Sequence, residues 1–170
     1  MSHKINHLEL KAMRQSLGLT ASEACEFVPN AKGEPISLRY FQYIESGKRP
    51  ISDELDLIFF TKASHYTLLL EKLTSDIERW HKDNPRPTSD DADEYRKQIK
   101  SAKKLKLPFF HNFDDFVKVT KNENRAYWKI WQAVIGHLFL IGKLHHLDDT
   151  APIPTNFECW RWLNGDYNHQ

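Results

Sequence analysis

The stretch SLRYFQYIESGKRP, residues 37–50, decides the fold of the N-terminal part of this chain. Its first residue, Ser37, is a good helix N-cap, and Gly47 allows the left-handed backbone that ends a helix. Phe41 and Ile44 lie three residues apart on one face of the helix, and we expect that face to pack inward. The opposite face carries polar and aromatic side chains. The stretch therefore predicts a short helix with one buried and one exposed face.

Two further helices precede this stretch. Each begins with a capping box, in which an N-cap side chain and an acidic side chain three residues later satisfy free backbone amides. The two boxes are Asn6 with Glu9 and Thr20 with Glu23. They predict helices over residues 7–17 and from Thr20 to about Val28, and a break from Asn30 to Pro35 follows. Residues 1–52 are therefore expected to form a compact, all-helical head.

An apolar seam continues beyond the head, from Leu55 almost to Asn84, at helical spacing. It predicts one long helix. The seam can be buried in the core of a single chain, or it can join two copies of the chain. We slightly favour the second interpretation, because a small head leaves little else to cover the stripe. The seam residues assigned to the dimer contact are Phe59, Tyr66, Leu70, Leu73, Ile77 and Trp80.

The rest of the chain is expected to be mainly α-helical. Residues 53–150 combine the long helix with a small C-terminal dimerisation part, interrupted by a polar insert at residues 83–104. LKLPFF, residues 105–110, predicts a short β-strand, and Tyr127 to Leu147 predicts an apolar helix. Residues 151–170 form an aromatic tail.

The composition excludes several classes of protein. Of the 170 residues, 40% are hydrophobic, so the chain can build a real core and is not disordered. A formal net charge of +1 argues against a non-specific polycation, so nucleic-acid binding requires basic side chains gathered on one face. No apolar run is long enough to cross a membrane, and the N-terminus lacks a signal-like segment. We therefore expect a soluble, cytoplasmic protein.

Catalytic and metal-binding patterns are missing from the sequence. Cys25 and Cys159 form neither a disulfide framework nor a zinc-binding spacing. His137 and His145 lie two helical turns apart, which is not the usual spacing of helical metal ligands. No phosphate-binding loop or Ser-His-Asp order is present. We therefore expect no enzymatic activity, no cofactor and no metal.

The head resembles the Cro/cI (lambda-repressor-like) helix-turn-helix family. The likeness rests on LKAMRQSLGLTASEACEF, residues 10–27, followed by residues 37–50 in the right order. In that family a small residue lets the second helix press against the third, and Cys25 holds this place here. The sequence departs from the family in two ways. Cys25 and Phe41 are separated by an insertion, and Ala21 stands where a phosphate-binding Gln is common.

A second likeness extends beyond the head. The stretch at 37–50, the long helix, LPFF at 107–110 and YWKIWQAVIGHL at 127–138 are similar to the YdiL-like regulators, a group that includes anti-CRISPR-associated repressors. The likeness covers residues 5–147 apart from the polar insert. It implies a homodimeric repressor or autoregulator that binds an inverted repeat in double-stranded DNA. The alternative is an interaction module that holds an unknown protein partner through the long helix and the C-terminal region.

The helix-turn-helix resemblance also implies roles for side chains. Arg39 can bridge the O6 and N7 atoms of guanine, and Gln42 can bridge the N6 and N7 atoms of adenine. The expected DNA-binding residues are Ser37, Arg39, Tyr40, Gln42, Tyr43, Lys48 and Arg49. Arg14 and Glu45 are expected to form a structural ion pair instead, as is common in that family. The basic run from Arg96 to Lys106 is interpreted as a solvated face, with a second phosphate-binding surface as the alternative.

Overall fold

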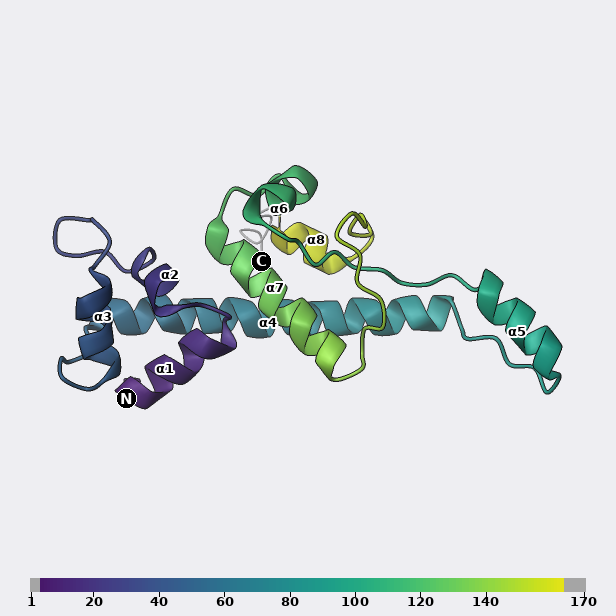
Figure 1. The fold of residues 1–170 in the computed structure, drawn as a ribbon, viewed down its shortest axis with the longest axis horizontal. Helices are drawn as coiled ribbons and strands as arrows, with labels where there is room; N and C mark the ends of the chain where they lie inside the picture. Colours follow the sequence, from purple (N-terminus) through teal and green to yellow (C-terminus); the bar gives the residue numbers. More distant parts are fainter. Residues whose placement is uncertain (1–3, 164–170) are drawn as a thin grey trace. The chain divides into compact units, whose positions relative to one another are not determined.

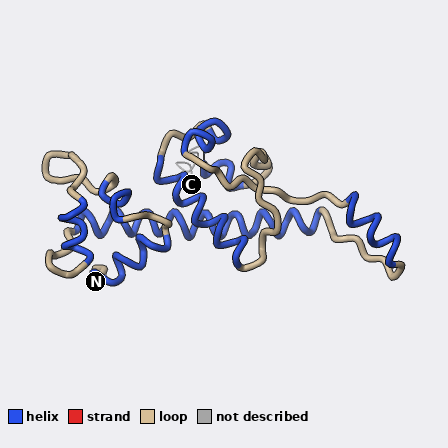
Figure 2. Tube along the Cα trace, in the orientation of Figure 1, coloured by secondary structure: helices blue, strands red, loops and turns tan. Residues whose placement is uncertain are grey.

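The computed structural model describes residues 4–163, and all regular secondary structure in this range is α-helical (Figure 2). The mainly α-helical class predicted from the sequence is thus confirmed. Residues 1–3 and 164–170, which belong to the predicted head and aromatic tail, lie outside the described residues. No helix in the described range is long and apolar enough to cross a membrane.

The chain divides into two compact units. Unit 1 comprises residues 1–68 and 124–134, and unit 2 comprises residues 69–123 and 135–170. This division differs from the boundaries predicted at residues 52 and 150. A segment far along the chain completes unit 1, and the aromatic tail belongs to unit 2. No local sequence pattern predicts that residues 124–134 join unit 1 or that the tail joins unit 2.

Unit 1 contains three short helices beside the first part of α4, Asp53–Asp83 (Figure 1). They are α1, His7–Ser16, α2, Ala21–Cys25, and α3, Leu38–Glu45. Both predicted capping boxes are present, and Ser37 caps α3 by accepting from the Tyr40 amide at 3.2 Å. Helix α2 is shorter than predicted, because the backbone beyond its C-cap, Glu26, joins the loop before α3.

The loop between α2 and α3 is ordered by its own hydrogen bonds. Asn30 Oδ1 accepts from the amides of Lys32 at 2.8 Å and Glu34 at 3.1 Å. Gly33 has a φ of +81°, a conformation that favours glycine. The two ends of the loop are joined by an isolated antiparallel bridge between Pro29 and Pro35. The insertion predicted here is therefore a tight, exposed turn at the start of α3.

The core of unit 1 joins α3 to the first half of α4. Phe41 and Phe59 are fully buried, and their rings stack with centroids 6.2 Å apart. Leu10 of α1 is also fully buried. This arrangement explains why α3 keeps one face inward, as its spacing predicted.

Unit 2 is built from the rest of α4 and α7 with three shorter helices. They are α5, Ala92–Ser101, α6, Phe113–Thr120, and α8, Glu158–Leu163. The strand predicted at residues 105–110 is wrong. Within the described residues, only Leu107 of this stretch pairs, in an isolated parallel bridge to Leu147 that is not extended on either side. Helix α7, Arg125–Leu140, ends before the predicted Leu147, and Gly142 follows it with a φ of +73°.

The tail helix α8 is fixed to α4 within unit 2. Buried Asp76 of α4 accepts a hydrogen bond from the Cys159 amide at 3.2 Å and lies 3.1 Å from Arg79, without hydrogen-bond alignment to it. Lys72 of α4 pairs with Glu158 at 3.0 Å. Trp162 of α8 is almost fully buried. The described part of the tail therefore contributes buried side chains to the core of unit 2.

The apolar seam of α4 proves to be only partly open. Phe59, Leu73 and Ile77 are buried within the single chain, so these three offer no surface to a second copy and their assignment to a dimer seam is wrong. Tyr66, Leu70 and Trp80 are half-buried. The reason is that distant parts of the same chain cover most of the stripe, which the spacing alone does not reveal.

Both cysteines are buried thiols. Cys25 of α2 donates to the Ala21 carbonyl at 3.1 Å, and Cys159 lies in the core of unit 2. Burial raises the pKa of each thiol, most strongly that of Cys159. Because the thiolate is the reactive form, both side chains serve as packing groups.

Candidate nucleic-acid interface

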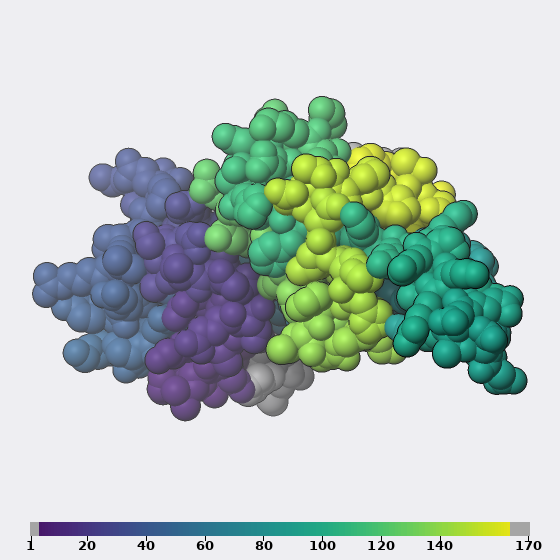
Figure 3. Space-filling view, turned by 45° about the vertical axis from the view of Figure 1, so that its right-hand side comes forward, coloured from purple at the N-terminus to yellow at the C-terminus, as the bar shows by residue number. Residues whose placement is uncertain are grey.

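Helix α3 packs against both α1 and α2, and this contact leaves one of its faces outward. Phe41 and Ile44 are the buried pair on its inner face. In the space-filling view, α1, α2 and α3 (purple to blue) form one continuous surface (Figure 3). On the outer face, Arg39 and Gln42 are exposed, and Tyr40 is 44% exposed. The polar side chains of the α3 outer face are thus available to a partner.

The angle of α3 is fixed by a partly buried ion pair. Arg14 of α1 donates from Nε and Nη2 to the two carboxylate oxygens of Glu45 of α3, at 2.6 Å and 3.3 Å. Its remaining terminal nitrogen donates to the Leu19 carbonyl at 2.6 Å. The two side chains are only 12% and 11% exposed. The pair expected for these residues is present, and it ties α1, the following turn and α3 together.

A cationic cluster lies on the outer surface of α3. Arg39 Nε donates to the Tyr43 hydroxyl at 2.9 Å, and its guanidinium carbon lies 5.5 Å from the Tyr43 ring centroid. Lys48 Nζ lies 5.6 Å from the same centroid. Tyr43 therefore holds two cations by the attraction of its ring. Among the described residues only Nε of Arg39 is engaged, so its two terminal nitrogens keep donors for the fork that recognises guanine.

None of the cations on this surface is neutralised within the described part of the chain. The ion pairs of residues 4–163 do not include Arg39, Lys48 or Arg49. Lys32, at the turn before α3, is also exposed and without such a pair. These four cations thus lie on α3 and its flanking loops without a carboxylate partner among the described residues. Together they give a surface able to bind an anionic backbone.

Helix α2 and the residues just after it are contacted by side chains of α4 and α7 within unit 1. Lys129 of α7 binds Glu23 at 2.5 Å, and Lys62 of α4 lies 4.3 Å from the ring centroid of Phe27. Partial burial would raise the pKa of Glu23, but the hydrogen bonds from Lys129 and Thr20 outweigh it, and the pKa is lowered. Burial lowers the pKa of Lys62. These contacts support the back of α2 and leave the α3 outer face open.

Most of the expected DNA-binding residues lie on α3 or directly after it, but they differ in whether their polar groups are already engaged. Arg39, Tyr40, Gln42 and Tyr43 follow one another along α3, and Lys48 and Arg49 come directly after it. The hydroxyl of Ser37 is already used as the N-cap of α3. Lys32 was not among the residues predicted from the sequence, and the hydrogen-bonded turn places it at the same end of α3 as Ser37. The signal that could have found it is the Asn and Gly of that turn.

In a comparison with known protein families, residues 5–147 of the chain match the Aca2/YdiL-like family. The chain belongs to this family. The matched range includes α1 to α7 and extends as far as Leu147, so membership rests on both units. The Aca2/YdiL-like family is a family of regulators, which gives this protein a regulatory role. No curated protein matches the chain.

Proposed function

We propose that this Aca2/YdiL-like protein is a sequence-specific DNA-binding transcriptional regulator. Helices α2 and α3 would act as a helix-turn-helix, with α3 in the major groove of double-stranded DNA. Arg39, Gln42, Tyr40 and Tyr43 would read base edges. Lys48, Arg49 and Ser37 would contact phosphates on either side. As a homodimer, the protein would bind the two halves of an inverted repeat.

The observation that carries this proposal is the unpaired cationic and polar outer face of α3. Helix α3 is held by its buried inner face and by the Arg14–Glu45 pair, while Arg39 and Gln42 remain exposed. A rigid helix with free donors outward can match a row of bases, and nearby cations supply affinity for the backbone. A merely solvated helix would not need its cations free of carboxylates.

The first experiment selects binding sites from random double-stranded DNA with the full chain and measures binding to the best site at two salt concentrations. We expect one enriched sequence with inverted symmetry, and binding that weakens steeply with salt because counterions are released from the phosphates. Enrichment of no sequence, with equal binding to all DNAs, would contradict sequence-specific recognition.

Contacts to bases and contacts to phosphates predict different effects of two protein substitutions on binding to the selected DNA site. Arg39→Ala should weaken binding by about 1–3 kcal/mol and relax the preference at one base position. Arg49→Ala should weaken binding to selected and random DNA alike and reduce the salt slope by about one. Lys118→Ala, at an exposed position of α6, is the matched control and should change neither quantity. Unchanged affinity in Arg39→Ala would show that α3 does not read bases.

The homodimer needs an apolar surface, and the end of α7 supplies a candidate. Phe139, Leu140 and Ile141 are consecutive and exposed, and Leu140 is 83% exposed. Three such residues in a row are unfavourable on the surface of a monomer. We expect the protein to have the mass of a dimer in light scattering after size exclusion, and Leu140→Asp to yield a monomer.

Phe60→Asp is the control for this dimer experiment, because Phe60 of α4 is also exposed, at 61%, but belongs to unit 1. It should leave the dimer intact. A dimer that survives Leu140→Asp would exclude the α7 surface. A wild-type chain that is monomeric at micromolar concentration would contradict the homodimer itself.

A further inference from the structure

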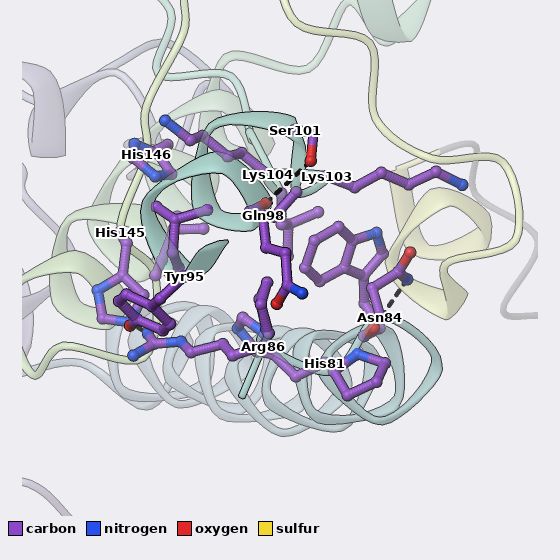
Figure 4. A pocket seen from close by; sticks show the side chains of 17 residues that line it. His81, Asn84, Arg86, Tyr95, Gln98, Ser101, Lys103, Lys104, His145 and His146 are labelled. Carbon is purple, nitrogen blue, oxygen red and sulfur yellow. Dashed lines mark hydrogen bonds between the residues drawn. The ribbon is translucent and has the colours of Figure 1, made fainter. Parts of the chain in front are cut away.

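Unit 2 contains a pocket of about 600 Å³, within the size range of small-molecule sites. Its walls come from the end of α4, the segment that leads to α5, α5 itself and residues 144–146 (Figure 4). Much of this lining is the polar insert at residues 83–104, for whose basic run the sequence suggested a solvated face or a phosphate-binding surface. The proposed recognition of DNA does not use it.

Part of the pocket lining is apolar and includes flat rings. Leu105 and Leu144 are buried, and Trp80 is half-buried beside them. Tyr95 of α5 lines the pocket as well. The side-chain amide of Gln98 projects from α5 into the hollow (Figure 4). Apolar and aromatic walls with a few polar groups among them are typical of sites for organic ligands.

The charged residues that line the pocket are all basic. They are Arg86, Lys103 and Lys104, accompanied by His81, His145 and His146. No Asp or Glu is among the described lining residues. In one adjoining hollow the carboxylate of Glu78 is bound to Lys143 at 3.0 Å, and Asp76 and Asp83 line another adjoining hollow. An anionic ligand would therefore meet no repelling carboxylate in this lining.

Arg86 is the cation best placed to hold an anion. Its Nη2 lies 3.0 Å from His145 Nε2, and because a guanidinium can only donate, the imidazole nitrogen is the acceptor in this contact. Arg86 and Tyr95 extend toward His145 at one end of the pocket, while Lys103 and Lys104 extend outward on either side (Figure 4). No carboxylate of the described residues pairs with Arg86. Its remaining donors are thus free for a charge-assisted bond.

We infer that this pocket binds a small aromatic anion. The ring would lie against Trp80, Leu105 and Leu144, and the carboxylate or phosphate would bind the guanidinium of Arg86. The apolar walls supply affinity by removing the ring from water, and Arg86 selects for charge. The site is complete within unit 2, so binding requires neither DNA nor a second copy.

The test uses two fluorescent probes that differ only in charge. Anilinonaphthalene sulfonate carries a sulfonate, and phenylnaphthylamine has the same rings without it. We expect the full chain to bind the sulfonate roughly ten-fold more tightly, the effect of one partly exposed charge-assisted bond. Equal affinity for the two probes would overturn the assignment.

Three variants test whether the probes bind in this pocket. Arg86→Gln should reduce the affinity for the sulfonate roughly ten-fold and leave the neutral probe unchanged, whereas Arg96→Gln, on the same insert but outside the pocket, should change neither. Gln98→Trp fills the pocket and should abolish binding of both probes. Circular dichroism checks that each variant is folded. Probe binding that survives in folded Gln98→Trp would place the dye elsewhere and overturn the site.

Displacement of the bound sulfonate identifies the anionic group. Indole acetate offers a carboxylate and adenosine monophosphate offers a phosphate, each on a flat ring system. The compound that displaces the dye at the lower concentration assigns the preferred group. If neither displaces it at millimolar concentration, the pocket does not take such anions and the proposal fails.

Discussion

Arg14 shows how one residue sets the orientation of the candidate recognition helix. Its guanidinium is shared between the carboxylate of Glu45 and the carbonyl of Leu19, with little access to water. We expect Glu45→Gln to lower the free energy of unfolding by about 2–4 kcal/mol, because it leaves the charge of Arg14 stranded in a partly buried site. Urea unfolding followed by circular dichroism measures this loss.

The control for the ion pair replaces both partners. In Arg14→Met with Glu45→Leu no charge is left unpaired, so the double variant should be more stable than Glu45→Gln. A single variant as stable as the wild type would show that water already compensates the charges. In that case the orientation of α3 depends on the packing of Phe41 and Ile44 alone.

At the scale of an element, α8 shows how a six-residue helix is kept in place by a neighbour. Buried Asp76 of α4 accepts from the Cys159 amide, and Glu158 binds Lys72 at the exposed end. Asp76→Ala should reduce the free energy of unfolding of unit 2 by about 2–4 kcal/mol, because the buried amide loses its acceptor and the packing loosens. Denaturant unfolding followed by tryptophan fluorescence measures this loss, because three of the five tryptophans, Trp80, Trp160 and Trp162, belong to unit 2.

Glu158→Gln is the matched change at the same element. Its side chain is half exposed, so the pairs with Lys72 and Arg79 are screened by water and the loss should stay below about 1 kcal/mol. Equal losses in the two variants would show that Asp76 contributes no more than a surface ion pair. The comparison therefore isolates the buried contact.

Elements that are specified locally were predictable from the sequence. Asn6, Thr20 and Ser37 all cap the helices they were expected to cap, because a cap needs only its own side chain and the next few amides. Residues 105–110 were not predictable in the same way. Their β-strand pattern was present, but a strand needs a neighbour, and only Leu107 has one, in Leu147.

At the scale of the whole molecule, two histidines link stability to pH. Burial and the nearby Lys62 lower the pKa of His65, and burial with Arg86 and His145 lowers that of His81. The unfolded chain takes up these protons near the ordinary value of 6.5, before the folded chain does. Stability is therefore complete above that pH and falls below it. We expect the melting temperature to drop as the pH is lowered from about 7.5 to about 5.5.

His65→Phe tests this linkage without removing the ring. The His65 ring stacks on Tyr127 with centroids 5.6 Å apart, and phenylalanine keeps a flat ring there but cannot take up a proton. The melting temperature of the variant should fall less between the same two pH values. A fall as large as in the wild type would assign the pH dependence to other groups.

Burial across the whole molecule was the part that the sequence could not reveal. The spacing of Phe59, Leu73 and Ile77 defined an apolar stripe, but residues distant along the chain decide what covers it. The pocket was hidden for the same reason, since Trp80, Tyr95 and His145 meet only after folding. The α3 outer face was easier to predict, because a single helix carries most of it.

The two buried thiols make the protein convenient for site-directed chemistry. Cys25 and Cys159 are the chain's only cysteines, and both are packed away with raised pKa values. A cysteine introduced on the surface would therefore be the fast-reacting one, with the native pair left in place. A fluorophore or spin label attached at an exposed position of α5, for example, would report on the insert while the core stays unmodified.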